Sequence, residues 1–188
     1  MIKEQNFSKG PIFGPLVRFA LPILLALFLQ TMYGAVDMMV VGQFATAADV
    51  SAVSTASWLM QLVTSLVVGI AVGTTVLLGR KLGEGNAAES GKIVGASIAL
   101  FGLLGIALTV AMELLAVPLV KLMQTPPEAV GAAVAYMRIC SAGTVFIVAY
   151  NVLGSVFRGI GNSRIPLMAV AFACVFNIAG DYLLVGVF

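Results

Sequence analysis

The sequence predicts an all-α membrane protein in which five transmembrane helices form a polytopic helical bundle. Hydrophobic residues make up 61% of the 188 residues and charged residues only 10%, whereas soluble domains are about half apolar and a quarter charged. The apolar residues fall into five segments, each long enough to cross the hydrocarbon core, which takes about 20 residues. Segments of about ten residues with alternating hydrophobicity, typical of transmembrane β-barrels, do not occur in the sequence.

The five predicted spans follow one another with short polar connections between them. The first is longer than the apolar core of a signal peptide, so we expect it to be retained as a span. The fifth has barely finished where the chain stops, so we expect the sequence to be a fragment of a larger protein. The predicted spans cover residues 16–41, 53–78, 93–120, 130–157 and 165–188.

Basic residues predict the orientation of these spans. Eight of the ten Lys and Arg residues lie before or at the start of the first span, between the second and third, or between the fourth and fifth. On the opposite side the loops contain Lys121, and Arg138 lies within the fourth span. Because cytoplasmic loops are enriched in Lys and Arg, we expect a multi-pass protein of the plasma membrane with a cytoplasmic N-terminus.

Two aspartates, Asp37 and Asp181, lie inside predicted spans. A charged carboxylate at the centre of a bilayer costs about 3 kcal/mol, and such residues usually face a cavity that binds ions or substrate. Gln30, Tyr33 and Asp37 share one face of the first span, and Asn177 lies one turn before Asp181 in the fifth. Both aspartates are predicted in the outer half of the membrane. They form either one shared polar site or two separate, solvated positions near the interface.

Further polar residues and glycines lie in or beside the second, third and fourth spans. Gln61 belongs to a stripe with three serines, which predicts helix–helix hydrogen bonds or, for Gln61, contact with a cavity. Asn151 is a single amide nearer the inner end of the fourth span. Glu113 and Arg138 have matched depth and opposite charge, so they form an ion pair or reach the headgroups independently. Three glycine pairs predict close helix packing: Gly69 with Gly73, Gly91 with Gly95, and Gly102 with Gly105.

Composition argues against several classes of function. There is no histidine, so proton transfer would depend on carboxylates with help from tyrosine or water. Cys140 and Cys174 lie singly in apolar segments, which favours packing over metal binding or redox chemistry. No nucleotide-binding motif occurs, and a net charge of +2 without a basic stripe argues against a nucleic-acid partner. We expect no cofactor and no enzymatic activity.

The chain resembles the N-terminal half of multidrug and toxic compound extrusion (MATE) transporters from about Phe13 onwards. Members of this family have twelve spans in two six-helix lobes that form a V around a central cavity. The resemblance implies that residues 1–188 are a partial N-terminal lobe, and that the sixth span and the C-lobe follow Phe188. It rests on the order and spacing of five segments: ALPILLALFLQTMYGAVDMMVVGQF, RKLGEGN, MQTPPEAVGAAVAYMRI, FRGIGNSRIP and FNIAGDYLLVGVF.

The resemblance also implies which residues bind the coupling cation and which line the substrate cavity. The positions that match the cation site are Asp37, Asn151, Asn177 and Asp181. Asp37 and Asp181 would be the ligands if the cation is Na⁺. The positions that match the substrate cavity are Gln30, Tyr33 and Tyr136. Gln61, in the polar stripe of the second span, is a further candidate for this cavity.

The function implied by this family is a cation-coupled antiporter that exports drugs or other organic cations by alternating access. The coupling ion would be Na⁺ or H⁺, and the partners would be membrane lipids and a small organic substrate. A flippase for lipid-linked oligosaccharides, of related fold, would have a more basic interior, for which only Arg138 is available. An intramembrane aspartyl protease also uses two carboxylates, but the fifth span contains AGD without the GxGD pattern of those enzymes.

Overall fold

The computed structural model describes residues 13–184, which form helices with short connections and contain no strand. The all-helical fold predicted from the sequence is thus confirmed. Four of the helices are each long and apolar enough to cross a membrane, and a bent pair would form a fifth span. The helices are α1 (Phe13–Phe44), α2 (Ala47–Gly83), α3 (Ala87–Leu122), α4 (Pro127–Ala142), α5 (Thr144–Gly159) and α6 (Arg164–Leu184).

The starts of α2 and α3 follow from the local sequence. At the start of α2, the backbone N–H of Asp49 donates to Oγ1 of Thr46 (3.3 Å), and the backbone N–H of Thr46 donates to Oδ2 of Asp49 (3.1 Å). This is a capping box, which satisfies two backbone donors at once. Before α3, Oδ1 of Asn86 accepts a hydrogen bond from the backbone N–H of Glu89 (3.1 Å). Gly85 precedes it with a left-handed φ of +74°, a conformation that favours glycine.

The fourth predicted span is one apolar segment in the sequence but two helices in the structure. α4 and α5 are bent by 47° relative to each other, with Gly143 between them. The backbone N–H of Gly143 donates to the carbonyl of Cys140 (3.0 Å), only three residues earlier, so the α-helical ladder ends there. Hydropathy does not register this break because the flanking residues are apolar. The fourth predicted span, residues 130–157, is therefore a bent pair of helices and not a single helix. Residues 185–188 of the fifth predicted span lie outside the described chain.

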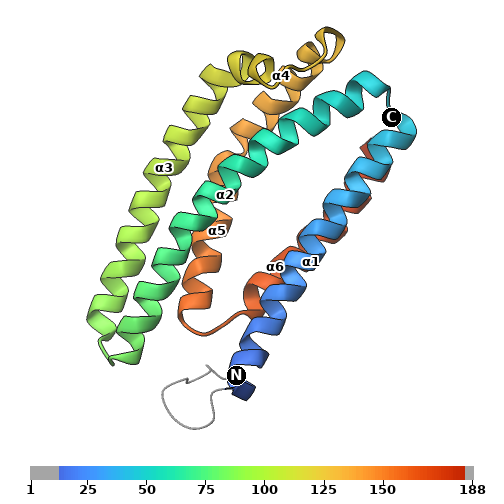
Figure 1. Ribbon diagram of the computed structural model, residues 1–188. Helices are drawn as coiled ribbons and strands as arrows, with labels where there is room; N and C mark the ends of the chain where they lie inside the picture. Colours follow the sequence, from blue (N-terminus) through green and yellow to red (C-terminus); the bar gives the residue numbers. More distant parts are fainter. Residues whose placement is uncertain (1–12, 185–188) are drawn as a thin grey trace.

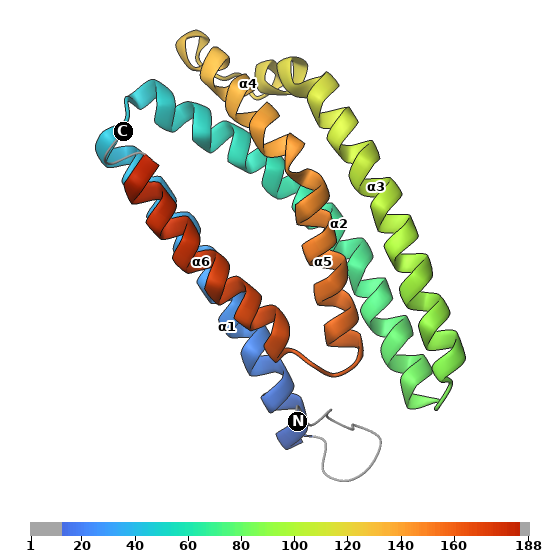
Figure 2. The same ribbon diagram turned by 180° about the vertical axis from the view of Figure 1, so that it is seen from behind.

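The helices form two groups, seen from opposite sides in Figures 1 and 2. α2 packs against α3, α4 and α5, and we call these four helices the α2–α5 bundle. α1 packs mainly along α6, and we call these two helices the α1–α6 pair. The pair contacts the bundle sparsely and is joined to it by the α1–α2 turn at one end and the α5–α6 connection at the other.

The buried core lies in the bundle. One cluster of buried side chains joins α2, α3 and α4, and a second joins α2, α3 and α5. Many of these residues are alanines, which let the helix backbones approach closely. Close packing matters here because lipid gives helices no hydrophobic reason to associate. The first cluster contains Ala52, Ala56, Met60, Met112, Ala116, Val120, Ala129, Ala133 and Met137.

Glycines allow close helix packing at only one of the predicted positions and at others that were not predicted. A Cβ at Gly159 would lie 3.0 Å from the side chain of Leu78, so only glycine lets α5 and α2 approach this closely. Among the predicted glycines, Gly105 packs closely, with Val148 3.4 Å from the position of its missing Cβ. The prediction is wrong for the other five in the described part of the chain, because spacing alone does not show which helix face meets a neighbour. Those five are Gly69, Gly73, Gly91, Gly95 and Gly102.

The α2–α3 connection carries a small ion-pair network. Glu84 accepts hydrogen bonds from Nζ of Lys81 (2.9 Å) and Nε of Arg80 (2.9 Å), and Lys81 also pairs with Glu89 (2.9 Å). These hydrogen bonds, that from Lys81 first, lower the pKa of the Glu84 carboxyl. Because these side chains are solvated, the network contributes little to stability.

Candidate functional site

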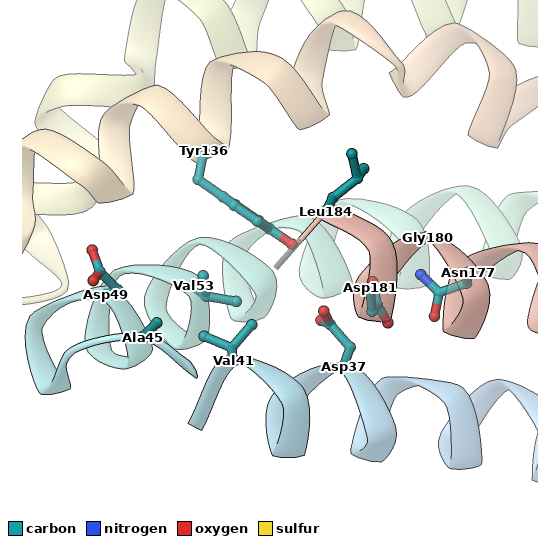
Figure 3. A pocket seen from close by; sticks show the side chains of 10 residues that line it. All are labelled: Asp37, Val41, Ala45, Asp49, Val53, Tyr136, Asn177, Gly180, Asp181 and Leu184. Atoms are coloured by element: carbon teal, nitrogen blue, oxygen red, sulfur yellow. The ribbon is translucent and has the colours of Figure 1, made fainter. Parts of the chain in front are cut away.

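A cavity of about 420 Å³ lies where the α1–α6 pair meets the α2–α5 bundle. This volume falls within the usual range of small-molecule sites. Its walls come from the end of α1, the start of α2, the middle of α4 and the end of α6 (Figure 3). The lining residues are Asp37, Val41, Ala45, Asp49, Val53, Tyr136, Asn177, Gly180, Asp181 and Leu184.

The structure brings Asp37 and Asp181 to this one cavity. Their helices, α1 and α6, lie side by side and run in the same direction, so two residues far apart in the sequence reach the same depth. Both side chains are partly buried, and both line the same cavity. Two like charges in a partly apolar environment repel each other, and a bound proton or metal cation relieves that repulsion.

The same cavity contains oxygen atoms that have no hydrogen-bond partner within residues 13–184. They are Oδ1 of Asn177 and Oδ2 of Asp181, both buried at the atomic level. Nearly all buried polar atoms in proteins are hydrogen-bonded, so an unpaired acceptor needs an explanation. Oxygen acceptors next to a carboxylate pair are suited to a hard cation such as Na⁺ or to a proton. No three His, Cys, Asp or Glu side chains of the described chain converge on a metal position, so the amide would be needed as well.

Tyr136 brings the bundle into the same cavity. It lies on α4, packs against the edge of the first core cluster and lines the cavity. Figure 3 shows its phenol oxygen directed across the cavity towards Leu184. Val41, Val53 and Leu184 make much of the remaining wall apolar. A small organic cation would thus meet apolar and aromatic surface together with carboxylates.

The other predicted site residues lie away from this cavity. Asn151 is buried in α5, where its Nδ2 donates to the carbonyl of Ile147 (2.8 Å) of its own helix. Gln30 and Tyr33 are partly buried on α1, nearer its start than Asp37. Gln61 is exposed on α2. None of the four lines the cavity that holds the two aspartates, and their roles remain predictions.

Asp49 lies in the cavity wall but was not predicted from the sequence as a site residue. A signal for its position was available. TAAD, residues 46–49, has the spacing of a capping box and therefore marks the start of a helix. That start lies directly after the span containing Asp37, so the carboxylate at the cap had to lie near the same end of the bundle.

Glu113 and Arg138 lie close together at the break between α4 and α5. The distance from Arg138 Nε to Glu113 Oε2 is 3.9 Å, so the predicted ion pair forms, although at the limit of such contacts. A stronger contact comes from Ser141, which is fully buried and whose Oγ donates to Glu113 Oε1 (2.6 Å). Glu113 thereby holds the end of α4 against α3.

Comparison with known proteins gives a family for this arrangement. The family model MatE matches residues 22–183. The chain is 28% identical over 187 residues to the probable multidrug resistance protein YpnP of Bacillus subtilis, covering 100% of this chain and 42% of YpnP. It is 30% identical over 175 residues to the probable multidrug resistance protein YoeA of the same organism. This match covers 93% of this chain and 38% of YoeA. The chain thus spans about two fifths of the length of the curated relatives it matches.

Solved structures share this fold. One is a MOP superfamily transporter from Pyrococcus furiosus, described as having a binding pocket of reverse polarity. It matches with a TM-score of 0.88 and 25% sequence identity, and the match covers 96% of this chain and 40% of that one. Another is a MATE protein in complex with MaD3S, with a TM-score of 0.87 at 25% identity and coverages of 96% and 41%. The first of these structures is named as a transporter and the second as a MATE protein.

Proposed function

Because the chain belongs to the MATE family, whose members are transporters and not enzymes, we propose that the full-length protein exports drugs or other organic cations in exchange for Na⁺ or H⁺. The observation that carries the proposal is the meeting of Asp37 and Asp181 in one cavity with unpaired acceptor oxygens. A proton or Na⁺ bound there would neutralise charge that the partly apolar surroundings disfavour.

Exchange follows if the cation and the drug favour different arrangements of the same helices. A cation between Asp37 and Asp181 joins α1 to α6, whereas a drug that also contacts Tyr136 joins the α1–α6 pair to the bundle. Each ligand then weakens the binding of the other, and the coupling free energy is the same in both directions. Alternating access in the full-length protein would convert this competition into export.

We propose a plasma-membrane location with a cytoplasmic N-terminus. The start of α1, the α2–α3 turn and the α5–α6 connection lie at one end of the molecule (Figure 1), and this end carries most of the basic residues of the described chain. Lys121 lies at the opposite end, beside the α3–α4 connection, and Arg138 lies in the last turns of α4. This asymmetry agrees with the positive-inside rule. The cavity then opens near the outer surface.

A flippase is not favoured by the cavity. The charged residues that line it are Asp37, Asp49 and Asp181, and no Lys or Arg of the described chain is among them. An acidic cavity attracts cations and repels the phosphate groups of lipid-linked sugars.

Charge-neutral variants of the full-length protein test the proposal. Efflux of ethidium from cells or proteoliposomes is measured under an imposed Na⁺ gradient and, separately, an imposed H⁺ gradient. Asp37→Asn and Asp181→Asn should each reduce gradient-driven efflux about tenfold or more, as expected for loss of a direct ligand. Glu128→Gln, an exposed acid in the first turn of α4, should leave efflux unchanged. Unimpaired efflux by Asp37→Asn would remove the carboxylate pair from the mechanism.

A further inference from the structure

Asp49 lines the cavity, but the proposed exchange of cation and drug gives its carboxylate no role. It comes from the first turn of α2, in the bundle, whereas Asp37 and Asp181 come from the α1–α6 pair. In Figure 3 it lies at the end of the cavity near Ala45, with the other two aspartates towards the opposite end. In the described chain no three acidic side chains come close enough to share a metal ion. Asp49 is therefore a separate charge and not a third ligand.

The capping box holds this charge in place without neutralising it. Oδ2 of Asp49 accepts hydrogen bonds from Oγ1 of Thr46 (2.6 Å) and from the backbone N–H of Thr46 (3.1 Å). Both bonds go to the same oxygen. Within residues 13–184 Asp49 forms no salt bridge. A fixed, unpaired negative charge thus stands at one end of the cavity.

We propose that Asp49 is a recruitment residue, whose negative charge concentrates cations at its end of the cavity and speeds their passage to Asp37 and Asp181. The inference rests on the proposed function and adds to it a residue that selects for positively charged ligands. Charges of one sign in a cavity with low-dielectric walls raise the local concentration of oppositely charged ligands. Val41 and Val53, which line the same cavity as Asp49, provide such walls.

Two variants separate the charge of Asp49 from its role in the cap. Asp49→Asn keeps an oxygen that can accept the Thr46 hydrogen bonds but removes the charge. Thr46→Ala removes the side-chain partner and keeps the charge. If the charge matters, only the first variant alters the attraction of cations; if the cap matters, both do.

A cysteine at Val53, which lines the cavity one turn after Asp49, can report the local potential in the full-length protein. Val53→Cys is placed in a background without other cysteines, including Cys140→Ser and Cys174→Ser. The rate of modification is measured with two methanethiosulfonates, one carrying a trimethylammonium group and the other a sulfonate. The ratio of the two rates measures the preference for a cation, and it requires no transport activity.

Asp49→Asn should lower this cation-to-anion ratio about threefold to tenfold at low ionic strength, the size expected for one nearby charge partly screened by water. At high ionic strength the difference should shrink, because salt screens exposed charges. Thr46→Ala should leave the ratio unchanged. A ratio that does not fall in Asp49→Asn, or that falls equally in Thr46→Ala, would overturn the proposal.

Transport gives the second arm of the test. With Val53 restored, Asp49→Asn should raise the external Na⁺ or H⁺ concentration that half-saturates efflux by about twofold to fivefold while leaving the maximal rate unchanged. An unchanged half-saturating concentration, despite a lowered reagent ratio, would also overturn the proposal. Running Asp37→Asn in parallel separates the two hypotheses. If Asp37→Asn transports normally, the carboxylate pair is removed from the proposed mechanism; if Asp37→Asn is inactive and Asp49→Asn is normal, only the recruitment role fails.

Discussion

The α1–α6 pair and the α2–α5 bundle consist of similarly apolar helices, but the bundle buries a larger share of them. In their most apolar windows, 22% of the residues of α2 and 17% of those of α3 are buried inside the chain, compared with none in α1 and 11% in α6. The bundle holds both core clusters, while the pair supplies Asp37, Asn177 and Asp181. The fold thus places its dense packing in the bundle and the two aspartates Asp37 and Asp181 on the pair, while the bundle adds Asp49 from the start of α2. The proposed ligand site lies where these two parts meet.

This separation predicts a large difference between two methionines. Met137 is 0% exposed in the bundle, and Met39 is 65% exposed on α1. Met137→Ala should lower the free energy of unfolding by about 2–5 kcal/mol, because it leaves a cavity among close-packed helices. Met39→Ala in the full-length protein should cost less than about 1 kcal/mol. Thermal unfolding in detergent measures both, and equal losses would contradict the contrast between pair and bundle.

Glycine gives a second comparison, this time within the bundle. The Cβ of Gly159→Ala would lie 3.0 Å from the Leu78 side chain, so α5 or α2 must shift, at a cost of about 1–3 kcal/mol. Gly69→Ala on α2 meets no atom within 4 Å and should not be destabilising. The two variants are compared by their yield of monodisperse protein and by their unfolding temperature. If Gly159→Ala unfolds no earlier than Gly69→Ala, the close α2–α5 contact is not as described.

The contact between Glu113 and Ser141 predicts a smaller effect. Ser141→Ala removes the 2.6 Å hydrogen bond to Glu113 and should cost about 1 kcal/mol. Arg138→Gln should cost less, because the Arg138 side chain is 55% exposed and lies 3.9 Å from Glu113. Unfolding temperatures of the two variants test this order. The reverse order would make the ion pair, and not the serine, the main attachment of α4 to α3.

The smallest effect is expected in the α2–α3 connection. Glu84→Gln removes two solvated ion pairs and should leave both efflux and folding almost unchanged. The pKa of Glu84 is lowered in the folded protein, so its contribution is complete at neutral pH and is lost as the pH falls through that lowered pKa. The small difference between Glu84→Gln and the unmodified protein should therefore vanish in acid.

The sequence predicted the parts of this structure that depend on hydropathy and helical spacing. The all-helical fold followed from apolar segments of span length. The two aspartates were predicted at similar depth in two helices, either in one shared site or in two separate positions, and the structure has both in one cavity. The spacing of Asn177 placed it on the same face as Asp181, and the structure has it in the same cavity.

Other features depend on contacts that spacing cannot reveal. The break at Gly143 is a change in backbone hydrogen bonding within an apolar segment. The glycines that pack closely are decided by which helix face meets a neighbour, as at Gly159 and Leu78. Asn151 satisfies its amide on its own helix, so an amide within a span need not face the cavity with the acids.

The central claim, that Asp37 and Asp181 form one cation site, is tested most directly by a double-mutant cycle in the purified full-length protein. The quantity is the rise in unfolding temperature on adding Na⁺, compared with an equal concentration of N-methylglucamine, or the rise on lowering the pH if H⁺ alone drives efflux. In a shared site Asp37→Asn, Asp181→Asn and the double variant should all lose this rise to the same extent, because either substitution destroys the site. If each single variant keeps about half of the rise and only the double variant loses it, the two aspartates act independently and the account is contradicted.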